Sequence, residues 1–127
     1  QDLSLVPVPF ASDLPPDSRL VPKKLTEAER RAVERAPLGS RDNPVRCFTP
    51  AGELGYLRRL RCASGAPPSY ERVGYDGIGP YGTALDAFRV ACAGRCTGWV
   101  VFFDMAHEGY VEKRPVPGFS IVPPRSS

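Results

Sequence analysis

The chain has 127 residues, of which 42% are hydrophobic and 24% are charged, a balance typical of a folded globular protein. Its 17 Lys and Arg residues against 14 Asp and Glu residues give a formal net charge of only +3, too weak to favour a nucleic-acid partner. The longest apolar run, residues 99–103, is far shorter than the roughly 20 residues that span a bilayer. We therefore expect one small domain with no membrane span.

Residues 1–25 are predicted to form a proline-rich extended arm, because five prolines interrupt any helix or central strand. Apolar side chains, Phe10 among them, lie between the prolines and are too numerous for an inert linker. An extended chain of this kind suits a groove on another surface. We expect the arm to dock on another protein chain, a single domain to occupy residues 26–122, and residues 123–127 to form a loose tail.

The clearest helix signal covers residues 26–36. Thr26 is the expected N-cap and Glu29 follows three residues later, which is the pattern of a capping box. Pro37 and Gly39 end the helix, because proline cannot continue it and glycine suits the conformation that follows it.

A second helix is predicted over residues 50–61, with Thr49 as N-cap and Pro50 in the first helical position. A strand over residues 56–62 is the alternative, because apolar and basic side chains alternate toward its end. A short strand over residues 45–48 precedes this segment.

Strands are expected mainly in the second half, at residues 69–75 (an edge strand), 85–92, 97–105, 109–113 and 118–122. Residues 97–105 are apolar on both faces, which predicts a central strand covered on both sides. Trp99, Val101 and Phe103 share one face of it, and Val100 and Phe102 share the other. The fold class is therefore α+β, a small antiparallel sheet with one or two helices.

Four cysteines in so short a chain indicate two disulfides and an oxidising, periplasmic or extracellular compartment. The expected pairs are Cys92–Cys96, across a three-residue hairpin loop, and Cys47–Cys62. Gln1 at the start of the sequence fits a mature terminus after signal-peptide removal. The alternatives are four free thiols, or a zinc site with His107, whose spacing fits poorly because Cys47 and Cys62 form no second ligand pair. We expect no metal and no cofactor.

A glycine motif, G-x-G-x-x-G, starts at Gly77, and Asp104 follows it at a distance typical of the dinucleotide fingerprint. The context does not fit, because Pro80 and a strand follow the first glycines where a helix is needed. We interpret the motif as an ordered loop, in which Tyr75 and Tyr81 are candidates for a recognition surface.

His107, the only histidine, lies between Asp104 and Glu108 just after the predicted central strand. Imidazole titrates near neutral pH, so these three residues are the candidates for general acid–base catalysis. In this hypothesis His107 acts with Glu108 and one arginine from the cluster at residues 58–61, of which Arg58 and Arg61 share a helix face.

The favoured interpretation is a small exported, non-enzymatic interaction module or accessory subunit. Its expected binding residues are Phe10 in the arm, Tyr75, Tyr81, Arg58 and Arg61. The alternative is a small secreted hydrolase or nuclease that uses His107 as general acid and base.

Overall fold

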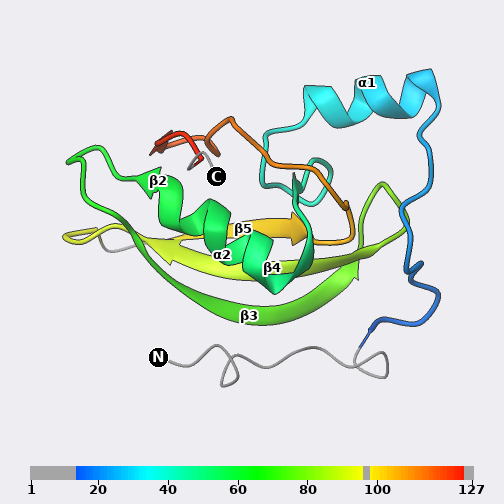
Figure 1. Ribbon diagram of the computed structural model, residues 1–127, viewed down its shortest axis with the longest axis horizontal. Helices are drawn as coiled ribbons and strands as arrows, with labels where there is room; N and C mark the ends of the chain where they lie inside the picture. The colour runs from blue at the N-terminus through cyan, green and yellow to red at the C-terminus, as the bar shows by residue number, and fades with distance from the viewer. Residues whose placement is uncertain (1–13, 96–97, 125–127) are drawn as a thin grey trace.

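A computed structural model describes residues 14–95 and 98–124 of the chain (Figure 1). It has an α+β architecture: two helices, a four-stranded sheet and a separate two-stranded ribbon. The predicted fold class is confirmed. Helix α2 crosses one face of the sheet, while α1 lies apart, beyond one end of it (Figure 1).

Helix α1 (Glu27–Arg35) forms as the sequence predicts. The hydroxyl of Thr26 accepts a hydrogen bond from the backbone N–H of Glu29, and the Glu29 carboxylate accepts one from the backbone N–H of Thr26. These bonds satisfy two N–H groups that a helix start leaves unpaired. Only Val33 is buried, so α1 is a charged surface helix.

Helix α2 (Thr49–Arg59) also forms, with two differences from the prediction. The N-cap is Phe48 and makes no side-chain cap, while Thr49 has a φ of 63°, in the left-handed region. The helix ends at Arg59 because strand β2 (Leu60–Arg61) begins there, so the strand alternative holds for those two residues. Strand β2 pairs with β6 (Ser120–Ile121).

The four-stranded sheet has the order β1-β5-β4-β3. Its strands are β1 (Val45–Arg46), β3 (Ser69–Ile78), β4 (Ala84–Ala91) and β5 (Trp99–Asp104). Strands β3, β4 and β5 are antiparallel, whereas β1 runs parallel to β5. The expected edge strand is confirmed as β3. The strand expected over residues 109–113 does not form: its first residues belong to a turn, and the segment continues without a strand partner.

The core lies between the sheet and α2. Phe103 is fully buried and contacts the rings of Tyr56 on α2 and Phe88 on β4 edge to face. The side chains of β5 alternate between the two faces as predicted. The prediction that both faces are covered is wrong. Val100 is 53% exposed, and Phe102 is half-buried under the guanidinium of Arg41, because neither of the two described helices covers this face.

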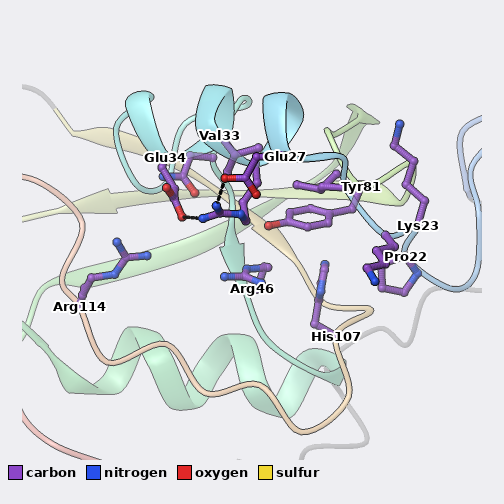
Figure 2. Close-up of a pocket in the computed structure, with 13 residues that line it drawn as sticks. Pro22, Lys23, Glu27, Val33, Glu34, Arg46, Tyr81, His107 and Arg114 are labelled. Carbon is purple, nitrogen blue, oxygen red and sulfur yellow. Dashed lines mark hydrogen bonds and ion pairs between the residues drawn. The ribbon is translucent and has the colours of Figure 1, made fainter.

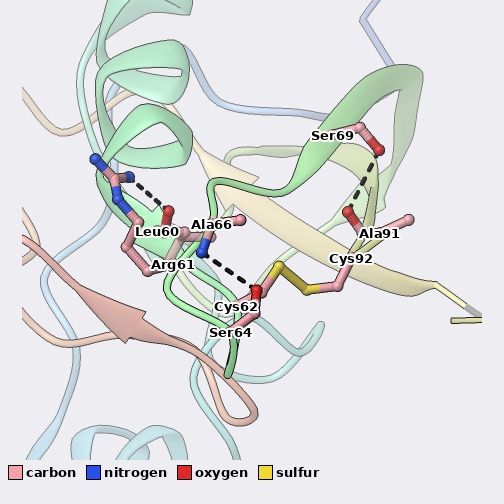
Figure 3. The surroundings of a disulfide bond; sticks show 8 residues. All are labelled: Leu60, Arg61, Cys62, Ser64, Ala66, Ser69, Ala91 and Cys92. Atoms are coloured by element: carbon pink, nitrogen blue, oxygen red, sulfur yellow. Dashed lines mark hydrogen bonds between the residues drawn. A yellow bond between two sulfur atoms is a disulfide. The ribbon is translucent and has the colours of Figure 1, made fainter. Parts of the chain in front are cut away.

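The predicted disulfide pairs are wrong. Cys62 bonds to Cys92, 30 residues apart, where β2 and β4 end beside each other (Figure 3). Cys47 is a free, buried cysteine. Eleven residues of helix carry the chain about 16 Å along its axis, which separates Cys47 from Cys62. Since Cys92 is taken by Cys62, it cannot pair with Cys96, which lies outside the described residues.

Residues 1–13, with Phe10, lie outside the described part of the chain, as do residues 125–127. From Leu14 onward the arm runs beside the β3–β4 connection. The backbone N–H of Arg19 donates to Gly82 O (2.7 Å), and that of Lys23 donates to Tyr81 O (2.9 Å). The division of the chain at residues 25 and 122 remains a prediction.

Candidate functional site

The site is built around Asp104, which ends β5. Its carboxylate is fully buried and accepts hydrogen bonds from the hydroxyl of Thr83 and from the backbone N–H of Ala106 (3.2 Å). His107 lies three residues further along the chain, and its Nε2 atom is 3.0 Å from Oδ2 of Asp104. This nitrogen makes no hydrogen bond of good geometry, so the contact is an ion pair when the imidazole is protonated. The sequence prediction that grouped Asp104 with His107 therefore corresponds to a spatial pair.

The His107 ring is held from two further sides. The backbone N–H of His107 donates to Cys47 O (3.0 Å). The ring of Tyr81 contacts the imidazole edge to face, with 4.6 Å between the ring centroids. Tyr81 lies in a tight turn closed by a hydrogen bond from Gly82 N–H to Gly79 O. Gly82 has a φ of 80°, and a side chain there would overlap Arg19, so the turn requires glycine.

His107 and Tyr81 face a cavity of about 760 Å³ between α1, residues 22–25 and the end of the sheet (Figure 2). A volume of this size is typical of small-ligand sites. We call it the His107 cavity. Its lining residues are Pro22, Lys23, Lys24, Leu25, Glu27, Arg30, Val33, Glu34, Asn43, Arg46, Tyr81, His107 and Arg114.

Most charges at this cavity are compensated. Arg30 contacts both Glu27 and Glu34 along α1, as the dashed lines in Figure 2 show. Lys23 pairs with Glu29 (2.8 Å), and the Lys23 ammonium is the main cause that lowers the pKa of that carboxyl to about 2.

Arg46 is different. This half-buried guanidinium has no carboxylate partner among the described residues. It lies 4.0 Å from the ring centroid of Tyr110 and 5.4 Å from that of Tyr81, and it donates to the Tyr110 hydroxyl (2.9 Å). Two aromatic rings therefore orient an arginine that no acid of the described residues neutralises.

A second cavity, of about 660 Å³, lies along α2. We call it the α2 cavity. Arg46 lines both cavities, and Arg58 and Arg61 line the second one. Its lining residues are Arg46, Cys47, Gly52, Gly55, Tyr56, Arg58, Arg59, Arg61, Tyr110, Val111, Glu112, Val122, Pro123 and Pro124.

The predicted catalytic set is only partly brought together. Glu108 is exposed in a turn and lines neither cavity, because the chain turns away directly after His107. The arginines at positions 58–61 line the α2 cavity and not the His107 cavity, which corrects the hypothesis that one of them acts with His107 and Glu108.

The predicted binding residues are also dispersed. Tyr81 lines the His107 cavity, whereas Tyr75 lies on β3 with the guanidinium of Arg72 5.2 Å from its ring centroid. Arg46 and Arg114 were missed by the sequence analysis. Arg46 follows the buried Val45 in the two-residue strand β1, so its side chain points to the other face. This alternation in the sequence could have identified Arg46 as an outward-facing residue.

The glycine motif connects β3 to the antiparallel strand β4. A dinucleotide site needs a helix after the glycines and a parallel sheet, so the motif forms a β-turn and not a phosphate cradle.

Another polar cluster is sealed under α2. Arg72 binds Asp86 through Nε (2.8 Å) and Nη2 (2.8 Å), and Asp86 in turn contacts the buried carboxyl of Glu53. Burial raises the pKa of Glu53 to about 10, the hydrogen bond and charge of Asp86 add to this shift, and Arg72 opposes it. Both acids are at most 1% exposed, so the cluster supports the fold and offers no site to a ligand.

Within residues 14–95 and 98–124, no three His, Cys, Asp or Glu side chains are placed to hold a metal ion. Cys92 is also bound in a disulfide, which removes it from the zinc alternative. In the same part of the chain no helix is long and apolar enough to cross a membrane.

Comparison of the chain with models of known protein families, with curated proteins and with solved structures gives no match. The function has to be argued from the chemistry of the two cavities.

Proposed function

We propose that this protein is a small, non-enzymatic binding module that recognises an anionic group, a carboxylate or a phosphate, in the His107 cavity. The observation that carries the proposal is Arg46, a half-buried guanidinium with no acidic partner in the described structure. Arginine presents a planar fork that matches either anion in two parallel hydrogen bonds.

The surroundings of Arg46 strengthen this proposal. The Tyr110 and Tyr81 rings limit the rotamers of its side chain, so little entropy is lost when an anion binds. His107 and the exposed side chain of Lys24 line the same space. An anion in this cavity would therefore meet the oriented guanidinium of Arg46 and the ammonium group of Lys24.

The test is titration of the full chain with succinate and with inorganic phosphate. Binding is monitored by NMR of the arginine Nε–Hε groups and by calorimetry. We expect saturable shifts at Arg46 and His107, and at least tenfold weaker binding in Arg46→Gln. The control is Arg89→Gln, which removes an exposed strand arginine paired with Glu71 outside both cavities. Equal affinity in Arg46→Gln and Arg89→Gln would overturn the proposal.

A second candidate function is hydrolysis of a phosphodiester, supported by the 3.0 Å contact between Asp104 and His107. The buried carboxylate would stabilise the imidazolium that forms when His107 takes a proton from the attacking water. The water oxygen would form a new P–O bond as the P–O bond to the leaving group breaks, and the imidazolium would return the proton to the departing oxygen. Arg46 would face the phosphate oxygens.

Turnover of bis(p-nitrophenyl) phosphate and of an oligoribonucleotide tests this candidate. General acid–base catalysis is typically worth about 10²–10⁴-fold, so His107→Asn should lose at least a hundredfold in rate if His107 is the base. Activity that survives unchanged in His107→Asn rejects the role of His107. If the wild type turns over neither substrate, the hydrolase candidate is rejected and anion binding is the function that remains.

The compartment and the partner remain proposals as well. The Cys62–Cys92 disulfide is compatible with a periplasmic or extracellular protein, where such bonds persist. We propose that the arm of residues 1–25 helps to dock the module on another protein chain. Deletion of residues 1–16 should then abolish co-purification with that partner while the circular dichroism spectrum is unchanged. A partner that still co-purifies with the deleted protein argues against the arm.

A further inference from the structure

We infer that the His107 cavity and the α2 cavity together form one extended site for an acidic peptide segment of a partner protein. This inference rests on the proposed anion recognition at Arg46 and extends it along α2. Its starting point is that Arg46 lines both cavities.

Besides Arg46, one ion pair has a member at each of the two cavities. Beside Arg46 lies the ion pair of Arg114 and Glu112, of which Arg114 lines the first cavity and Glu112 the second. Arg114 is 63% exposed at its side chain, so this ion pair borders solvent. A ligand can therefore pass from one cavity to the other over Arg46 without entering the core.

The charge along this path is positive, although ion pairs on and beside α1 neutralise part of it, since Arg30 pairs with Glu27 and Glu34 and Lys23 pairs with Glu29. The residues that line the two cavities include eight Lys and Arg side chains and only three Glu side chains, although the net charge of the whole chain is just +3. Complementary charge of this kind selects an anionic partner and speeds its association.

The basic side chains of the α2 cavity differ in what they do. Arg59 donates to Glu112 O (2.6 Å) and so ties the C-terminal segment to α2, a structural role. Arg61 donates to the carbonyls of Arg58 and Leu60 (both 2.8 Å), which fixes its guanidinium at the helix end. Arg58 is exposed, with no acidic partner in the described structure. Arg58 and Arg61 are therefore the residues available to an anion.

The apolar part of the α2 cavity favours a peptide over other polyanions. Val111 is 54% exposed and Val122 is 36% exposed, and prolines 123 and 124 lie beside them. Gly55 leaves open space on the facing surface of α2, which lets a backbone approach closely, whereas Gly52 packs against Cys47. A nucleic-acid strand would instead need free aromatic faces for stacking, and one face of Tyr110 is already covered by Arg46.

The experiment compares one short and one long probe on the full chain. The short probe is succinate, and the long probe is an N-acetylated octapeptide in which Asp and Val alternate. We expect the Arg58→Gln/Arg61→Gln variant to bind the octapeptide at least fivefold more weakly than the wild type and to bind succinate equally well. Arg46→Gln should weaken both probes. The control variant Arg31→Gln/Arg89→Gln loses the same charge outside both cavities and should bind as the wild type.

The outcomes separate this inference from the proposed function. If succinate binds at Arg46 but the octapeptide is insensitive to Arg58→Gln/Arg61→Gln, the extended site is rejected and anion recognition stands. If neither probe binds, the proposed function itself fails. Tighter binding of decathymidylate or of a heparin octasaccharide than of the octapeptide overturns the peptide assignment. Should the double variant melt below the wild type, the single exposed substitution Arg58→Glu replaces it, with the same expected loss.

Discussion

Glu53 on α2 and Asp86 on β4 meet as two carboxyl groups in the interior, both fully buried, and of these two acids only Asp86 forms an ion pair with the guanidinium of Arg72. Two adjacent carboxylates do not both remain ionised in such a place, because burial and their mutual repulsion favour the proton. Asp86 is paired with the cation, so the proton stays on Glu53. A protonated acid on the helix thus lies against an ion-paired acid on the sheet.

This arrangement predicts a pH-dependent stability. The pKa of Glu53 is about 10 in the folded chain against 4.5 for an unperturbed Glu. The folded state keeps a proton that the unfolded state releases above pH 4.5, so stability falls as the pH rises from 4.5 to 10, by at most about 1.4 kcal/mol per pH unit. Glu53→Gln should flatten this dependence, measured by urea unfolding at pH 5, 7 and 9.

Glu71→Gln serves as the control for that series, since Glu71 is exposed on β3 and pairs only at the surface. Its unfolding free energy should follow the wild-type pH dependence. An unchanged slope in Glu53→Gln would show that Glu53 is ionised in the folded protein.

The Cys62–Cys92 disulfide is directly testable by peptide mapping, because arginines in the sequence let trypsin place each of the four cysteines in a separate peptide. Trypsin should release, without reduction, residues 62–72 linked to residues 90–95. Loss of a cross-link over about 30 residues costs about 3–4 kcal/mol in the chain-entropy account. Cys62→Ala/Cys92→Ala should therefore melt well below the wild type. A link between residues 90–95 and the peptide that begins at Cys96 would contradict this pairing.

Cys47 should be chemically inert in the folded protein. Burial raises the pKa of its thiol far above the ordinary range, and the neighbouring acids Glu53, Asp104 and Asp86 add to the shift. The thiolate is the reactive form, so alkylation is suppressed. In a Cys96→Ser background at pH 8, Ellman's reagent should react only after urea is added. Rapid reaction without urea would show that the interior opens at Cys47.

The sequence predicted those features that are encoded within a few residues. Thr26 and Glu29 specify the start of α1 through a local capping box, and the alternation of Trp99, Val101 and Phe103 specifies the face of β5. The disulfide pairing could not be predicted in this way, because it depends on where β2 and β4 end in space. For the same reason the sequence did not point to Arg46, which lies 61 positions before His107 and is brought to the same cavity by the parallel pairing of β1 with β5.

Neighbouring valines on β5 provide the sharpest test of the sheet's orientation. Val101 is 3% exposed in the core, whereas Val100, the adjacent residue, is 53% exposed on the opposite face. An unpaired charge buried at position 101 costs several kcal/mol, a large part of the roughly 5–15 kcal/mol that stabilises a domain of this size. Val101→Asp should therefore prevent soluble expression. Val100→Asp should fold and melt within a few degrees of the wild type, because its carboxylate stays in water.

Val101→Ala keeps the comparison measurable if the Asp variant yields no protein. We expect it to lose about 1–3 kcal/mol of unfolding free energy in urea, against almost none for Val100→Ala. Equal losses at the two positions would mean that both faces of β5 are covered, as the apolar run alone suggests.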